Sequence, residues 1–169
     1  MAVIFNSTAS SPTANSYLSV IEADDYNSRT NNDSSWAILA TGEKERLLMW
    51  ATSLIDSHFE FIGARTNFYQ ALKWPRFDII VDDKIYSKDI VPQQVKDATA
   101  EMAKVLRTTN TTIDTRTGEI SSIKIGSIGV DFKTDADQYQ KTIPSIVNEL
   151  LAEFINSQLG AGASVRWLR

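Results

Sequence analysis

The chain has 169 residues, 43% of them apolar, with a formal net charge of −4 and an isoelectric point near 5.0. This length and apolar content predict a single domain with its own hydrophobic core. The absence of cysteine excludes disulfides, thiolate metal sites and thiol catalysis. Only residues 160–169 are purely basic, so the charge pattern disfavours tight general binding to DNA phosphates.

The N-terminal segment is polar and is expected to extend from the domain. Residues 6–15 read NSTASSPTAN and offer almost nothing to bury, so residues 1–15 are predicted to form an extended arm. The apolar run at residues 2–5 is too short for a signal peptide, and no later run reaches the roughly 18 apolar residues of a membrane span. We therefore expect synthesis in the cytoplasm and no membrane contact.

Two helices are predicted in the first third of the chain. Ser19 followed by Glu22 has the form of a capping box and predicts a short helix over residues 20–29, with Ile21 and Tyr26 facing inward. Thr41 is expected to cap a longer helix over residues 43–58, in which apolar residues recur at helical spacing. This longer helix is predicted to be the centre of the core.

Residues 61–76, FIGARTNFYQALKWPR, are too irregular for a helix and are predicted to join two helices. Gly63 can adopt backbone angles that other residues avoid, and Pro75 favours an extended conformation at Trp74. We interpret Gly63, Gln70, Trp74 and Pro75 as the structural joint, with Trp74 in the core. A small hairpin is expected next, over residues 79–86.

The second half of the chain predicts two more helices separated by a β-hairpin arm. The helices begin near Pro92 and Pro144, because proline suits a first helical position. Between them, apolar and polar residues alternate over about residues 119–133, and Gly126 with Ser127 suits a hairpin turn. A lone two-stranded ribbon is marginal in water, so Ile125 and Ile128 are expected to meet the helical core or a neighbouring subunit.

The predicted fold is therefore mainly α: a small bundle of about four to five helices with an extended β-hairpin arm and extended termini. Residues 16–159 form the helical domain, and residues 160–169 form an extended C-terminal tail. Within this tail Trp167 stands between Arg166 and Arg169, and aromatic and arginine side chains are favoured at protein interfaces.

The sequence offers little for catalysis or metal binding. Ser53, Asp56 and His58 resemble parts of a hydrolytic triad, but they lie on one predicted helix without a strained nucleophile turn. One histidine without cysteine partners cannot fill a zinc site. We expect no catalytic residue, no metal and no cofactor, and we predict that the protein is not an enzyme.

The chain resembles the phage head-to-tail connector family, also called adaptor or head-completion proteins, some of whose members are labelled DnaT-like single-stranded DNA-binding. The most specific element is Trp74-Pro75-Arg76 following Gly63, Arg65 and Gln70. Other matching positions are Ser16-Tyr17, Ala23-Asp24, Tyr26, Trp36, Ala51-Thr52, Ile55-Asp56, Phe61, Pro92, Val95-Lys96, Ala98 and Glu101, and more loosely Gly126, Pro144 and Leu150-Leu151. The resemblance covers about residues 16–108 well.

The resemblance implies a structural virion protein of a tailed phage or prophage, made in the host cytoplasm and placed in the neck, at the head-tail junction. It implies a homo-oligomeric ring, expected to be a dodecamer, that completes the DNA-filled head. Its partners would be the portal protein and a tail or tail-terminator (stopper) protein. DNA would pass through the channel without specific binding, which the acidic balance favours.

Two further hypotheses concern the joint. Arg65 and Arg76 either pair with carboxylates such as Asp56 or Glu22, in the same subunit or the next, or are solvated loop arginines.

The alternative function is that of a single-stranded DNA-binding replication accessory protein, which needs exposed aromatic side chains on which bases stack. Lys73, Trp74 and Arg76 are the one such place identified in the sequence.

Overall fold

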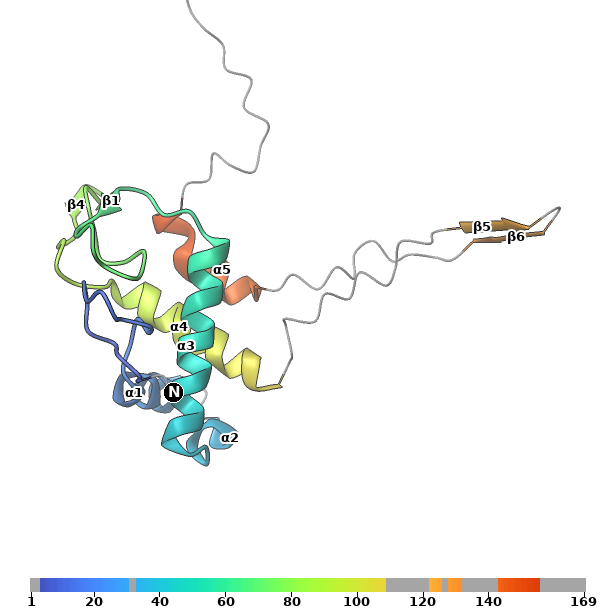
Figure 1. Ribbon diagram of the computed structural model, residues 1–169, viewed down its shortest axis with the longest axis horizontal. Coiled ribbons are helices and arrows are strands. Elements are labelled where there is room, and N and C mark those ends of the chain that lie inside the picture. The colour runs from blue at the N-terminus through green and yellow to red at the C-terminus, as the bar shows by residue number, and fades with distance from the viewer. Residues whose placement is uncertain (1–3, 31–32, 109–121, 126–127, 132–142, 156–169) are drawn as a thin grey trace, which may run out of the picture.

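A computed structural model describes residues 4–30, 33–108, 122–125, 128–131 and 143–155. In these residues the fold is mainly α-helical, as predicted, with five α-helices and three short antiparallel strand pairs (Figure 1). The helices are α1 (Val20–Arg29), α2 (Ser34–Ala37), α3 (Thr41–His58), α4 (Gln93–Thr108) and α5 (Ser145–Leu151), which continues into the 3-10 helix η2 (Ala152–Phe154). The strand pairs are β1 (Ala64–Arg65) with β2 (Arg76–Phe77), β3 (Ile80–Val81) with β4 (Lys84–Ile85), and β5 (Ser122–Ile125) with β6 (Ile128–Asp131).

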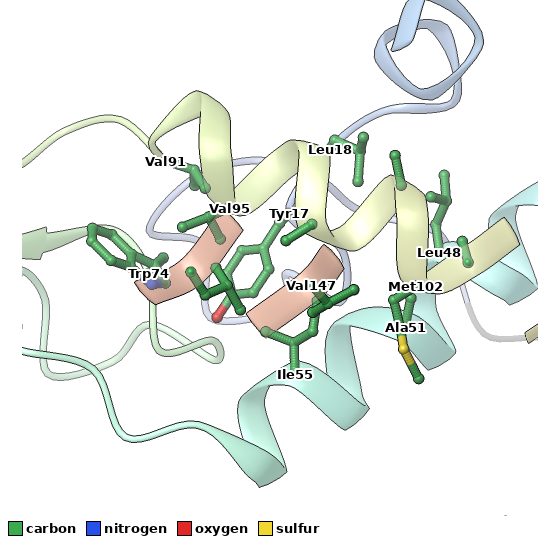
Figure 2. Packing of buried hydrophobic residues seen from close by; sticks show 14 of the residues in the cluster. Tyr17, Leu18, Leu48, Ala51, Ile55, Trp74, Val91, Val95, Met102 and Val147 are labelled. Carbon is green, nitrogen blue, oxygen red and sulfur yellow. The ribbon is translucent and has the colours of Figure 1, made fainter. Parts of the chain in front are cut away.

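The core lies where α4 packs against both α3 and α5. Each helix contributes apolar residues spaced three or four apart, which places them on one face. Figure 2 shows this packing, with Ile55 from α3, Met102 from α4 and Val147 from α5 among the buried side chains. In the described residues, no helix combines the length and the apolar character needed to cross a membrane.

The predicted capping box at the start of α1 is present. The Ser19 hydroxyl accepts a hydrogen bond from the backbone N–H of Glu22 at 3.2 Å, and the Glu22 carboxylate accepts one from the Ser19 N–H at 2.7 Å. The inward placement of Ile21 is wrong, because its side chain is 81% exposed. The buried face of α1 carries Ala23 and Tyr26, and a residue two positions before Ala23 points to the opposite side of a helix.

The central helix α3 begins two residues earlier than predicted, so Thr41 is its first residue rather than its cap. Ala40 occupies the cap position, and the Glu43 carboxylate accepts its backbone N–H at 3.3 Å. The helix ends at His58, and the chain then enters the joint between α3 and α4.

The N-terminal segment also differs from the expected extended arm over the part that is described, residues 4–15. Asn6 donates its N–H to Oδ1 of Asn15 at 2.8 Å, and the Asn15 side chain donates to the carbonyl of Ile4 at 2.8 Å. The carbonyl of Ser11 accepts the N–H of Ala71 at 3.1 Å. Asparagine side chains thus supply hydrogen bonds that hold a segment too polar to be held by burial.

The predicted hairpin arm is present as β5 and β6, which pair from Ser122 with Asp131 to Ile125 with Ile128. Its turn, residues 126–127, and the predicted tail, residues 160–169, lie outside the described residues. The expected small hairpin after the joint is also present, with Ile80 opposite Ile85.

Candidate functional site

The joint between α3 and α4 is closed by the strand pair β1 and β2, in which Ala64 lies opposite Phe77 and Arg65 opposite Arg76. Gly63, directly before β1, has a φ of +69°. A Cβ atom at this position would lie 2.4 Å from the carbonyl oxygen of Phe77 and 2.6 Å from Cδ1 of Ile79. Only glycine therefore fits here without a backbone shift.

Arg76 holds the joint together through the backbone. Its Nε donates to the carbonyl of Ile62 at 2.6 Å, and its Nη1 donates to that of Lys73 at 3.2 Å. Its Nη2 donates to the carbonyls of Phe61 at 3.1 Å and Gly63 at 2.6 Å.

Within the described residues of one subunit, Arg76 is neither paired with a carboxylate nor a solvated loop arginine. The guanidinium bonds carbonyl groups of its own loop, and the two carboxylates considered have other partners. Glu22 pairs with Lys96, and Asp56 accepts hydrogen bonds from the Tyr17 hydroxyl and the Lys73 N–H.

Trp74 is a core residue with 1% of its surface exposed, and its peptide bond to Pro75 is cis. Its ring makes edge-on contacts with Phe61, at 5.5 Å between ring centroids, and with Phe154, at 5.4 Å. Lys73 donates to the carbonyl of Phe59 and pairs with Glu60. The predicted place of Trp74 in the core is confirmed, and the Lys73, Trp74 and Arg76 site considered for base stacking has no exposed ring.

Gln70 fixes the loop that precedes Trp74. Its side chain is buried, and its Nε2 donates to the carbonyls of Leu72 at 2.8 Å and Pro75 at 3.0 Å. Its Oε1 accepts the backbone N–H of Asn67 at 2.9 Å. One amide group thus joins the two ends of residues 67–75.

Residues 67–70 form a tight turn that we call the aromatic turn. The backbone N–H of Gln70 donates to the carbonyl of Asn67 at 3.2 Å, and the N–H of Tyr69 donates to Oδ1 of Asn67 at 2.9 Å. The two central residues are Phe68, 90% exposed, and Tyr69, 75% exposed. Their rings lie edge to face, with centroids 5.4 Å apart. Two large rings are therefore presented to solvent on a backbone that is fixed by hydrogen bonds.

A basic residue precedes the aromatic turn closely in the chain. Arg65 is exposed, three residues before Phe68, and within the described chain it makes no hydrogen bond or ion pair. The hydroxyl of Thr66 donates to the carbonyl of Lys88 at 2.7 Å, which brings a second basic residue close to this loop. The pKa of Arg76 is lowered by burial and by the charge of Arg65 opposite it.

The other proposed interface residues belong to the hairpin arm and to the predicted tail. Ile125 and Ile128 are register partners at the end of β5 and the start of β6. Arg166, Trp167 and Arg169 lie outside the described residues. No group of three His, Cys, Asp or Glu side chains that could hold a metal occurs in the described part of the chain.

Phe68 and Tyr69 are not among the site residues predicted from the sequence. The signal that could have found them is two adjacent aromatics between Asn67 and Gln70, since asparagine favours turns and the centre of a turn projects from the surface. Their exposure matters because large apolar groups presented together on a surface mark binding sites.

The model of a family described as "Putative DnaT-like ssDNA binding protein" matches residues 1–169. No curated protein and no solved structure matches the chain. The predicted virion role is that of a ring that binds portal and tail proteins and lets DNA pass without specific binding. The family description names DNA binding instead and therefore contradicts this prediction. Over its whole length, the chain belongs to this DnaT-like family.

Proposed function

We propose that this protein binds single-stranded DNA and that the aromatic turn is its base-stacking contact. The observation that carries the proposal is the exposure of Phe68 and Tyr69 on a turn fixed by hydrogen bonds. Stacking of a base on an aromatic side chain contributes about 1–3 kcal/mol and tolerates any base, because every base has a π-face. The family description supports the same ligand.

The site suits single strands better than duplex DNA. In a duplex the faces of the bases are covered by their neighbours, so a protein must read base edges or phosphates. The net charge of −4 does not favour wide contact with the phosphate backbone. An unpaired strand offers free base faces, which are the groups that two exposed rings can use. The proposed activity is binding and needs no catalytic group.

The fixed backbone favours this contact energetically. Ordering a flexible loop on binding would consume part of the interaction energy, and a turn already held by Asn67 and Gln70 avoids most of that loss. The rings are also the only large apolar side chains of the described residues 66–72 that are exposed, since Leu72 packs against the core.

The test is fluorescence anisotropy with a labelled oligothymidine of about 20 nucleotides, longer than the site of one small module. We expect Phe68→Ala and Tyr69→Ala each to weaken binding by about 5- to 150-fold, the equivalent of one stacked base. Ile21→Ala is the matched control, because it removes an equally exposed apolar side chain from α1. A duplex of the same length should bind much more weakly than the single strand.

Two results would contradict the proposal. One is wild-type protein that does not bind the oligonucleotide at low salt. The other is full affinity in the Phe68→Ala, Tyr69→Ala double variant, which would indicate that the rings contact a protein partner instead. Unchanged thermal melting of the variants would show that any loss of affinity does not come from unfolding.

A further inference from the structure

Two arginines lie directly opposite each other in the strand pair whose strands stand before and after the aromatic turn in the chain. Arg65 of β1 is the register partner of Arg76 of β2. Like charges in directly opposed positions destabilise a strand pair. Such an arrangement becomes favourable when an anion binds beside it, so the pair marks a place where a negative group would be stabilised.

The two arginines are not equivalent. Arg76 is held by four backbone carbonyl contacts and has its donors directed into the joint. Arg65 makes no hydrogen bond or ion pair in the described residues, although its charge helps to lower the pKa of Glu60, and Glu60 itself pairs with Lys73 at 2.8 Å. Arg76 therefore contributes positive charge from a fixed position, and Arg65 has a free guanidinium that can contact an anion.

We infer, building on the proposed function, that the site reads two adjacent unstacked bases and a single phosphate, with Arg65 as the phosphate contact. The ligand is thus a short step of single-stranded DNA recognised mainly through the faces of its bases. Arg65 and the two rings lie within five consecutive residues, 65–69, which matches the short reach of one nucleotide step. A protein that held many phosphates would need a basic stripe, which this sequence does not have.

A single phosphate contact predicts a weak dependence of the binding constant on salt concentration. For single strands, each neutralised phosphate contributes a slope of about −0.7 to log K plotted against log salt concentration. One phosphate predicts that a tenfold rise in salt weakens binding only about fivefold. Contact with five or more phosphates would weaken it by more than about a thousandfold over the same range.

The experiment measures the affinity of the oligothymidine at several NaCl concentrations for wild type, Arg65→Gln and Arg46→Gln. We expect a slope near −0.7 for wild type and a slope near zero for Arg65→Gln, which retains base stacking. Arg46 is an exposed arginine on α3, with 73% of its side chain accessible, and its substitution should leave the slope unchanged.

A second arm uses an oligonucleotide of equal length in which every base is replaced by an abasic site. It keeps all the phosphates and removes the groups that stack, so we expect affinity to fall by at least about 30-fold. A steep slope that Arg65→Gln does not change would overturn the inference while leaving base stacking by the aromatic turn intact. Equal affinity for the abasic strand would overturn the inference and the base-stacking contact together. No binding of the oligothymidine at any salt concentration would instead overturn the proposed function itself.

Discussion

The hydroxyl of Tyr17 donates a hydrogen bond to Oδ1 of Asp56 on α3. The other carboxylate oxygen of Asp56 accepts the backbone N–H of Lys73 at 3.0 Å. One carboxylate therefore connects the segment before α1, the central helix and the joint that carries the aromatic turn. The placement of the candidate site relative to the core depends on this connection.

Removing the Tyr17 hydroxyl should destabilise the fold. Tyr17→Phe leaves the partly buried Asp56 carboxylate with one protein partner fewer, and an unsatisfied group of this kind costs about 1–3 kcal/mol. The free energy of unfolding, measured by urea denaturation, should fall by that amount. Tyr69→Phe is the control, since its exposed hydroxyl should change stability by less than about 0.5 kcal/mol. Equal stability of the two variants would argue against a role for the bond.

Gly63 and Gly42 should respond in opposite ways to substitution by alanine. Gly63→Ala places a Cβ 2.4 Å from the Phe77 carbonyl at a positive φ, so we expect a loss of at least about 1–2 kcal/mol. Gly42 lies in α3, where an added Cβ would meet no atom within 4 Å, and alanine there should keep or raise stability by up to about 1 kcal/mol. Thermal melting of both variants tests this, and a stable Gly63→Ala protein would contradict the close approach described.

Substitution of Arg76 and substitution of Arg65 should change the free energy of unfolding by different amounts. Arg76→Lys keeps the charge but cannot reproduce a planar group that bonds four carbonyls, so we expect a loss of about 2 kcal/mol or more. Arg65→Lys should leave the free energy of unfolding within about 0.5 kcal/mol of wild type, because Arg65 is exposed. Similar losses in both variants would mean that Arg65 has a structural role.

Much of the helical structure follows from local sequence signals. Three such signals are the period of apolar residues in α3 and α4, the capping box at Ser19 and the proline before α5. Each depends on residues close together in the chain, so each can be recognised from the sequence alone. The hairpin of β5 and β6 is signalled in the same way by alternation around a turn.

The elements that position the candidate site could not be predicted in this way. Strands β1 and β2 have two residues each, which is too short for any periodic pattern, and the carbonyls that bind Arg76 come from positions up to 15 residues away. The exposure of Phe68 could not be predicted for a related reason. Burial of one aromatic and exposure of another are decided by which of them meets Phe61 and Phe154 in the folded core.

Two carboxyl groups should give the protein opposite responses to pH. Burial raises the pKa of Asp56 and outweighs its hydrogen bonds from Tyr17 and Lys73. Burial also acts to raise the pKa of Glu22, but hydrogen bonds from Lys96 and Ser19 outweigh it, so the pKa of Glu22 lies below its usual value. As pH rises above the usual pKa of a carboxyl group, about 4, ionisation of Asp56 favours unfolding. Ionisation of Glu22 opposes unfolding at lower pH, as pH rises up to that usual value.

The substitutions Asp56→Asn and Glu22→Gln separate the two contributions when urea denaturation is followed between about pH 2 and pH 7. Relative to wild type, the destabilisation caused by Asp56→Asn should shrink as pH rises, because the variant lacks the carboxyl that resists ionisation in the folded state. The destabilisation caused by Glu22→Gln should grow over the same interval, because the folded state gains from the ionised carboxylate that only wild type has. A change of the same sign in both variants would contradict the assignment, since it would place both carboxyl groups in environments that shift the pKa in one direction.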